Sequence, residues 1–92
     1  MVRFRATPAN QLFLNVGRRV AEVRESLGLT QERFAASLDV SSKYVQSVEA
    51  GRENLSLRTV AKIAATLRVE PASLLTPPTT PKRRPGRPKA LS

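Results

Sequence analysis

The stretch LTQERFAASLDVSSKYVQSVEA, residues 29–50, decides the fold because its pattern predicts two short helices separated by a tight turn. Thr30 can cap the first helix by accepting a hydrogen bond from a free backbone N–H of the first turn. That helix runs to Leu38 and ends at Asp39, a residue type that tolerates the left-handed conformation better than most. The side chains that recur on its inward face are Phe34, Ala35 and Leu38.

The second helix of the pair is predicted over residues 41–50. Ser41 is the capping residue, and Gly51 is the stop. The inward-facing residues are Val45 and Val48. Two short helices joined by a tight turn form the unit whose second helix lies in the major groove of DNA. The spacing therefore predicts a DNA-reading pair.

Three more helices are predicted around this pair, which gives an all-α, compact bundle of five short helices. A helix from about residue 10 to residue 27, ended by Gly28, carries an apolar stripe at three- and four-residue steps: Leu12, Val16, Val20, Val23 and Leu27. Ser56 caps the fourth helix, whose inward residues are Leu57, Val60, Ile63, Ala64 and Leu67. Pro71 suits the first turn of a last short helix over residues 71–75. No segment alternates with period two, so no sheet is expected.

The basic charge lies mainly at the two ends of the chain. The net charge is +9, yet residues 11–75 hold nine Lys and Arg residues against all seven acidic residues. Arg3 and Arg5 add two cations, and the last 17 residues add five. Because each neutralised phosphate releases condensed counterions, basic arms beside a balanced domain predict polyanion binding. The alternative is a like-charged tail that only aids solubility.

Composition divides the chain into three regions. Residues 1–9 are expected to be a flexible basic lead, and residues 10–75 the folded helix-turn-helix domain. Residues 76–92 contain five of the seven prolines and no apolar cluster, which predicts a disordered, basic tail.

Several function classes are disfavoured by composition. The chain has no cysteine and no histidine, which removes the commonest zinc ligands and the usual general base. Its 92 residues leave little room for an active-site cavity, and no pocket chemistry converges. We therefore expect no catalytic residues, no metal and no cofactor. No apolar run approaches the ~18 residues of a membrane span, and the first ten residues lack a secretory signal, so a cytoplasmic, nucleoid-associated protein is expected.

The run LTQERFAASLDVSSKYVQSVEAGRENLSLRTVAKIAATLRVEPASLL, residues 29–75, resembles the phage-repressor and Cro type of helix-turn-helix, also called XRE-like or lambda-repressor-like. With the first helix included, the resemblance covers roughly residues 12–75. It rests on the LTQ opening, the VEAG close of the third helix and the apolar spacing taken together. The resemblance implies a lambda-repressor-like bundle that binds double-stranded DNA.

Four residues of the third helix match the family positions that face base edges: Ser42, Lys43, Gln46 and Ser47. Lys43 can donate to guanine O6 and N7, and Gln46 can pair with adenine N6 and N7. A good bidentate contact discriminates against the wrong base by about 1 to 3 kcal/mol. The alternative is a solvated helix face, since exposed positions are usually polar.

Other positions match family contacts to the DNA backbone. Gln31 matches the glutamine that opens the second helix, where its amide can donate to a phosphate; the alternative is an exposed polar residue. Tyr44 suits either a phosphate contact or surface packing. Arg52 and the free amides of residues 51–56 should lie near phosphates, with Arg58 on the same side.

Two further matches concern architecture. Arg24 and Glu49 match a family pair that forms a partly buried salt bridge between the first and third helices. Many family members place glycine in the turn before the third helix, where this chain has Asp39, at a small expected cost.

The tail sequence KRRPGRPK, residues 82–89, resembles an AT-hook, whose Gly-Arg-Pro core lies in the minor groove of A/T-rich DNA. Gly86 allows close approach of the backbone, and Arg87 supplies charge. The usual core has arginine before the glycine, but here Pro85 stands there and Arg84 is one step removed. A general phosphate-binding tail is the alternative, and a solubilising end is a third.

These observations predict a sequence-specific transcriptional regulator, a repressor or autoregulator such as a restriction-modification controller or phage-type repressor. Two-fold pairing multiplies the few contacts of one small module, so a homodimer is expected. Its seam would involve Val69, Leu74 and Leu75, unless these residues only close the core. The alternatives are an antitoxin-type or adaptor protein-interaction module, or a nucleoid-associated architectural DNA binder.

Overall fold

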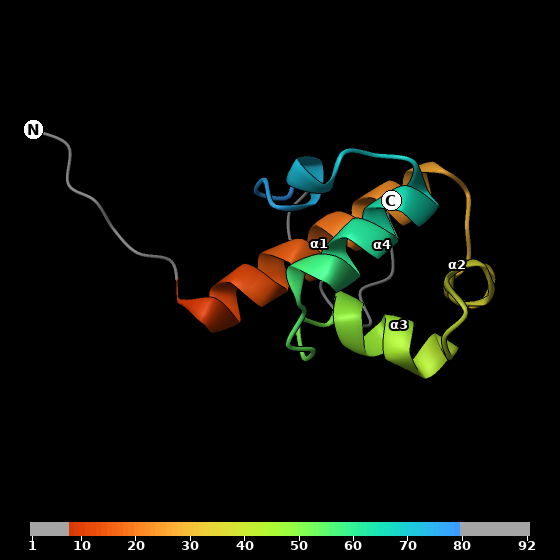
Figure 1. Ribbon diagram of the computed structural model, residues 1–92, viewed down its shortest axis with the longest axis horizontal. Coiled ribbons are helices and arrows are strands. Elements are labelled where there is room, and N and C mark those ends of the chain that lie inside the picture. Colours follow the sequence, from red (N-terminus) through yellow and green to blue (C-terminus); the bar gives the residue numbers. More distant parts are fainter. Residues whose placement is uncertain (1–7, 80–92) are drawn as a thin grey trace, which may run out of the picture.

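The computed structural model describes residues 8–79 as a helical bundle (Figure 1). It consists of α1 (Ala9–Ser26), α2 (Gln31–Leu38), α3 (Ser42–Glu49) and α4 (Leu57–Leu67), followed by η1 (Pro71–Leu74). No strand occurs in this range. The predictions made for Arg3, Arg5, Arg84 and Arg87 fall outside the described residues.

Side-chain caps start three of the helices where the sequence predicted them. The Thr30 and Ser41 hydroxyl oxygens accept from the backbone N–H groups of Arg33 and Tyr44, each at 3.0 Å, and Ser56 does the same for α4 at 3.1 Å. Each hydroxyl satisfies a donor that has no partner inside its helix. The predicted caps of α2, α3 and α4 are therefore confirmed.

Two helices end on non-glycine residues in the left-handed conformation. Asp39 has φ 63° and ψ 46° at the end of α2, which confirms the turn predicted between α2 and α3. Arg68 has φ 62° and ψ 44° at the end of α4. Because arginine lacks aspartate's short polar side chain, this second position is the more strained of the two.

The fifth predicted helix is a single turn of 3-10 helix, so the bundle has four α-helices and η1. The backbone N–H of Ser73 donates to Glu70 at 2.9 Å, and that of Leu75 donates to Ala72 at 3.0 Å. These are three-residue steps, which suit a segment too short to develop the α-helical pattern.

The core takes apolar side chains from every helix. Its members are Val16, Val20, Val23, Phe34, Ala35, Leu38, Val45, Val48, Val60, Ile63, Ala64, Leu67 and Leu74. Three leucines predicted to face inward are instead exposed: Leu12 by 40%, Leu27 by 52% and Leu57 by 77%. Leu12 and Leu57 lie in the first turns of α1 and α4, and Leu27 is the C-cap of α1. The helical period was predicted correctly, but the length of the buried stripe on α1 and α4 was overestimated.

The helices place α3 and η1 on different sides of the bundle. α3 packs against α1 and α2, whereas η1 packs against α4 and α1. In the view of Figure 1, α1 and α4 lie between α3 on one side and η1 with the segment after it on the other. Within the described residues, no helix is long and apolar enough to cross a membrane.

Candidate nucleic-acid interface

The outward face of α3 carries the four residues predicted to read bases. Lys43 and Gln46 are exposed, and Ser42 and Ser47 are half-buried. The two inward positions of the helix, Val45 and Val48, are buried in the core. At 3.6 residues per turn, the four polar residues form one strip along the side of α3 that faces away from the core.

Tyr44 packs its ring against the edge of the core. Burial raises the pKa of the Tyr44 phenol above its ordinary value, and the negative charge of Glu53 raises it further. The packing alternative is thus observed in the chain by itself, while a phosphate contact through the hydroxyl stays a prediction. Glu53 also brings a negative charge to the loop between α3 and α4.

Gln31 has a partner within the protein. Its side-chain Nε2 donates to Glu49 Oε1 at 2.9 Å, which ties the start of α2 to the end of α3. An amide NH₂ has two hydrogens, so this bond leaves a second N–H for another acceptor. The phosphate contact predicted for Gln31 stays a prediction.

Arg24 and Glu49 meet between α1 and α3. Arg24 Nε lies 2.6 Å from Glu49 Oε2, and one terminal nitrogen lies 3.1 Å from Oε1. The other terminal nitrogen donates to the Leu29 carbonyl at 2.6 Å. The hydrogen bond to Glu49 raises the pKa of Arg24, and burial offsets part of that rise. Within residues 8–79, no buried side-chain nitrogen or oxygen lacks a hydrogen-bond partner.

Arg52 and Arg58, the two predicted phosphate contacts beyond α3, are exposed. Six cations form no ion pair within the described part of the chain: Arg33, Lys43, Arg52, Arg58, Lys62 and Arg68. In contrast, the α1 residues Arg19 and Arg24 are bound to carboxylates. The unpaired cations therefore lie on α2, α3, α4 and the loop before α4. Arg33 was not singled out from the sequence.

Gly17 is a second residue that sequence reasoning missed. It is buried in the middle of α1, against the last carbonyls of α3. A Cβ atom at this position would lie 2.8 Å from the Glu49 carbonyl oxygen and closer still to that of Val48. Glycine in the middle of an amphipathic helix was the available signal, because it lowers helix propensity without an evident local reason.

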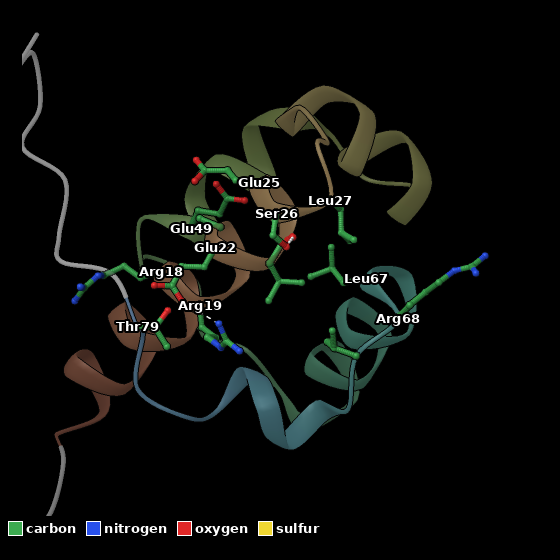
Figure 2. Close-up of a pocket in the computed structure, with 13 residues that line it drawn as sticks. Arg18, Arg19, Glu22, Glu25, Ser26, Leu27, Glu49, Leu67, Arg68 and Thr79 are labelled. Carbon is green, nitrogen blue, oxygen red and sulfur yellow. Dashed lines mark hydrogen bonds and ion pairs between the residues drawn. The ribbon is translucent and has the colours of Figure 1, made fainter. Parts of the chain in front are cut away.

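A surface groove of about 930 Å³ lies along α1 and the end of α4 (Figure 2). No described residue predicted to contact DNA lines this groove, although Glu49 of the predicted salt bridge does. Figure 2 shows Thr79 beside Arg18 and Glu22, whereas Arg68 points into solvent. In residues 8–79 no cluster of three or more Asp or Glu side chains could hold a metal ion.

Comparisons with known proteins agree with this geometry. The helix-turn-helix family HTH_3 matches residues 20–74. The chain is 39% identical over 62 residues to an uncharacterised HTH-type transcriptional regulator, y4dJ, of Sinorhizobium fredii. This match covers 67% of this chain and 80% of that protein. It is 37% identical over 59 residues to the control protein C.MunI of Mycoplasma sp.; this match covers 63% of this chain and 80% of that protein. The restriction-modification controller protein C.AhdI of Aeromonas hydrophila superimposes with a TM-score of 0.64 at 37% identity, over 67% of this chain and 94% of that one.

Proposed function

The chain belongs to the helix-turn-helix family, and from this premise we propose that it is a sequence-specific transcriptional regulator that reads double-stranded DNA with α3. The observation that carries the proposal is the strip of Ser42, Lys43, Gln46 and Ser47 on a helix held firmly from behind. The relatives' names describe a transcriptional regulator and two control proteins, which agrees with a regulatory role.

Base recognition would come from the two exposed long side chains of the strip. Lys43 presents three ammonium donors, which suit the acceptor pair O6 and N7 of guanine. Gln46 presents a donor and an acceptor on one amide, which suit the N6 and N7 edge of adenine. Ser42 and Ser47 are shorter and half-buried, so they fit contacts made where the helix comes closest to the groove.

Phosphate contacts would flank this strip. Arg52, in the loop after α3, and Arg58, in the first turn of α4, are exposed cations that form no ion pair within residues 8–79. Gln31 has a second N–H beyond the one that Glu49 accepts. These groups carry no sequence information, but they fix the register of α3 on the duplex.

A two-fold dimer would be built on the side of the bundle that carries η1. Of the three residues that the sequence suggested for the dimer interface, two already pack within the subunit: Leu74 is fully buried and Val69 packs against the core. Leu75 is 43% exposed. Leu75 is therefore the apolar anchor of the proposed seam. By analogy with the named controller proteins, the dimer would act as a repressor or autoregulator.

The basic tail would add contacts outside the base pairs that α3 reads. α3 rests on the flank of α1 that carries Gly17 and Arg24, whereas Thr79 lies beside Arg18 and Glu22 on another flank (Figure 2). Arg84 and Arg87 follow Thr79 in the sequence and would meet a minor groove or phosphates beside the base pairs that α3 reads.

Selection of bound duplexes from random DNA tests the proposed function. It is run at two salt concentrations with the full chain and with a double variant, Arg84→Ser and Arg87→Ser. We expect an inverted repeat from both proteins, with a salt slope shallower by up to about two for the variant, since each phosphate contact contributes about 0.9. Failure to enrich any motif, or enrichment only of A/T-rich DNA that is lost in the variant, would favour an architectural role.

A further inference from the structure

We propose that Gly17 is a positioning residue for DNA recognition, because its missing side chain sets how closely and at what angle α3 lies against α1. The inference rests on the proposed function of α3. It goes beyond that function because Gly17 is buried and has no side chain with which to contact DNA.

The contact at Gly17 joins backbone to backbone. A methyl group at position 17 would lie 2.8 Å from the Glu49 carbonyl oxygen and closer to that of Val48, which is nearer than real Cβ atoms approach. Both obstructing atoms belong to the main chain, so no side-chain rotation can make room. Because packed interiors transmit strain, α3 as a whole must move away from α1 to admit one methyl group.

Two other contacts fix the same end of α3 along the same side of α1. Gly51, just after α3, has φ 77°, and a Cβ there would lie 2.8 Å from the Leu14 Cα and 2.7 Å from its side chain. Two turns after Gly17, Arg24 holds the carboxylate of Glu49. Positions 14, 17 and 24 share one face of a helix with 3.6 residues per turn. Gly17 is thus the middle point of a three-point contact.

A shift at this contact reaches the reading residues directly. α3 has eight residues, so its length is only about 12 Å, and it moves as one rigid element. Hydrogen bonds to base edges need donor–acceptor distances of about 2.7 to 3.2 Å. Moving α3 by a few tenths of an ångström or more disrupts bidentate contacts, whereas phosphate contacts by flexible cations adapt. Loss of selectivity should therefore exceed loss of general DNA affinity.

The test compares the DNA affinity of the Gly17→Ala variant with that of the wild-type protein, both as full chains. Two duplexes are used: the one selected by the wild-type protein and a scrambled duplex of equal length. The matched control is Ala21→Gly, which weakens the same helix without adding an atom. Binding is measured at a temperature where circular dichroism shows each protein folded. We expect Gly17→Ala to lose at least tenfold in affinity for the selected duplex and less than about threefold for the scrambled one. Ala21→Gly should keep the wild-type ratio.

The inference is overturned if folded Gly17→Ala keeps the wild-type ratio, or if Ala21→Gly loses it equally. If Gly17→Ala does not fold, Gly51→Ala probes the same contact from the side of α3, and an unchanged ratio there overturns the inference as well. A wild-type chain that shows no preference between the two duplexes contradicts the proposed function instead, so the two failures are distinguishable.

Discussion

The guanidinium of Arg24 and the carboxylate of Glu49 form a doubly hydrogen-bonded ion pair that joins the second half of α1 to the last residue of α3. Both side chains are less than 10% exposed. Glu49 also accepts from Gln31, so one carboxylate connects three helices. The pair thus fixes the back of the helix that we propose reads DNA.

Removing one partner of this pair should be strongly destabilising. Arg24→Met leaves the Glu49 carboxylate buried without its cation, at an expected loss of about 3 to 5 kcal/mol in the free energy of unfolding. Urea unfolding measures the loss. The control Arg33→Met, at an exposed arginine that forms no ion pair in the described part of the chain, should change stability by less than about 0.5 kcal/mol. A loss for Arg24→Met no larger than that of the control would contradict a structural role for the pair.

The left-handed backbone conformation of Arg68 is predicted to lower the free energy of unfolding. Because a left-handed non-glycine residue is disfavoured by about 1 kcal/mol, Arg68→Gly should raise the free energy of unfolding by about 0.5 to 1 kcal/mol. The matched variant Arg68→Ala removes the same charge but keeps a Cβ, so it should not be stabilised. Urea unfolding of both variants checks this, and equal stability of the glycine and alanine variants would rule out backbone strain.

Tyr44 should make the folded protein less stable at alkaline pH. Its pKa is raised in the fold, so the unfolded chain loses the phenolic proton first, and stability falls as pH rises from about 10 through the native pKa. Because Tyr44 is the only tyrosine, ultraviolet absorbance follows its ionisation alone. Glu53→Gln should lower the native pKa but leave it above that in urea. Identical native and urea titrations would show that the ring is not buried.

Ser41 and Ser42 are adjacent serines with different expected roles. Ser41→Ala removes the cap of α3 and should cost about 1 kcal/mol of stability. Ser42→Ala keeps the cap and should leave stability within about 0.5 kcal/mol while weakening binding to the selected duplex. Urea unfolding and duplex titration of both variants measure these effects. A reversed pattern would mean that α3 begins elsewhere.

Local signals in the sequence predicted most of the fold. A capping serine or threonine and the turn at Asp39 depend on neighbours within three or four residues, so their chemistry can be read directly. The sequence did not predict where the buried face of each helix ends, because the exposure of Leu12 and Leu57 depends on how far other helices reach. The last helix was predicted in place, but a four-residue segment does not reveal whether its bonds follow the 3-10 pattern.

The candidate site was predictable as a set of exposed side chains but not as a mechanism for holding them. The bond from Gln31 to Glu49 and the approach of Gly17 to Val48 join residues 18 and 31 positions apart. Such contacts follow from the packing angle of the helices, which no local pattern specifies. The difference between the cations that form no ion pair within residues 8–79 and the carboxylate-bound arginines of α1 likewise depends on tertiary packing.

The most direct measurement is duplex selection with Lys43→Ala and, in parallel, Lys62→Ala. Both are exposed lysines without an ion pair in the described part of the chain, on α3 and α4 respectively. If α3 reads bases, Lys43→Ala relaxes the preference at one position of each half-site, by about 1 to 3 kcal/mol of discrimination. Lys62→Ala then recovers the unchanged wild-type motif. The same motif from both variants, or a uniform loss of affinity without relaxed preference, would contradict base reading by Lys43.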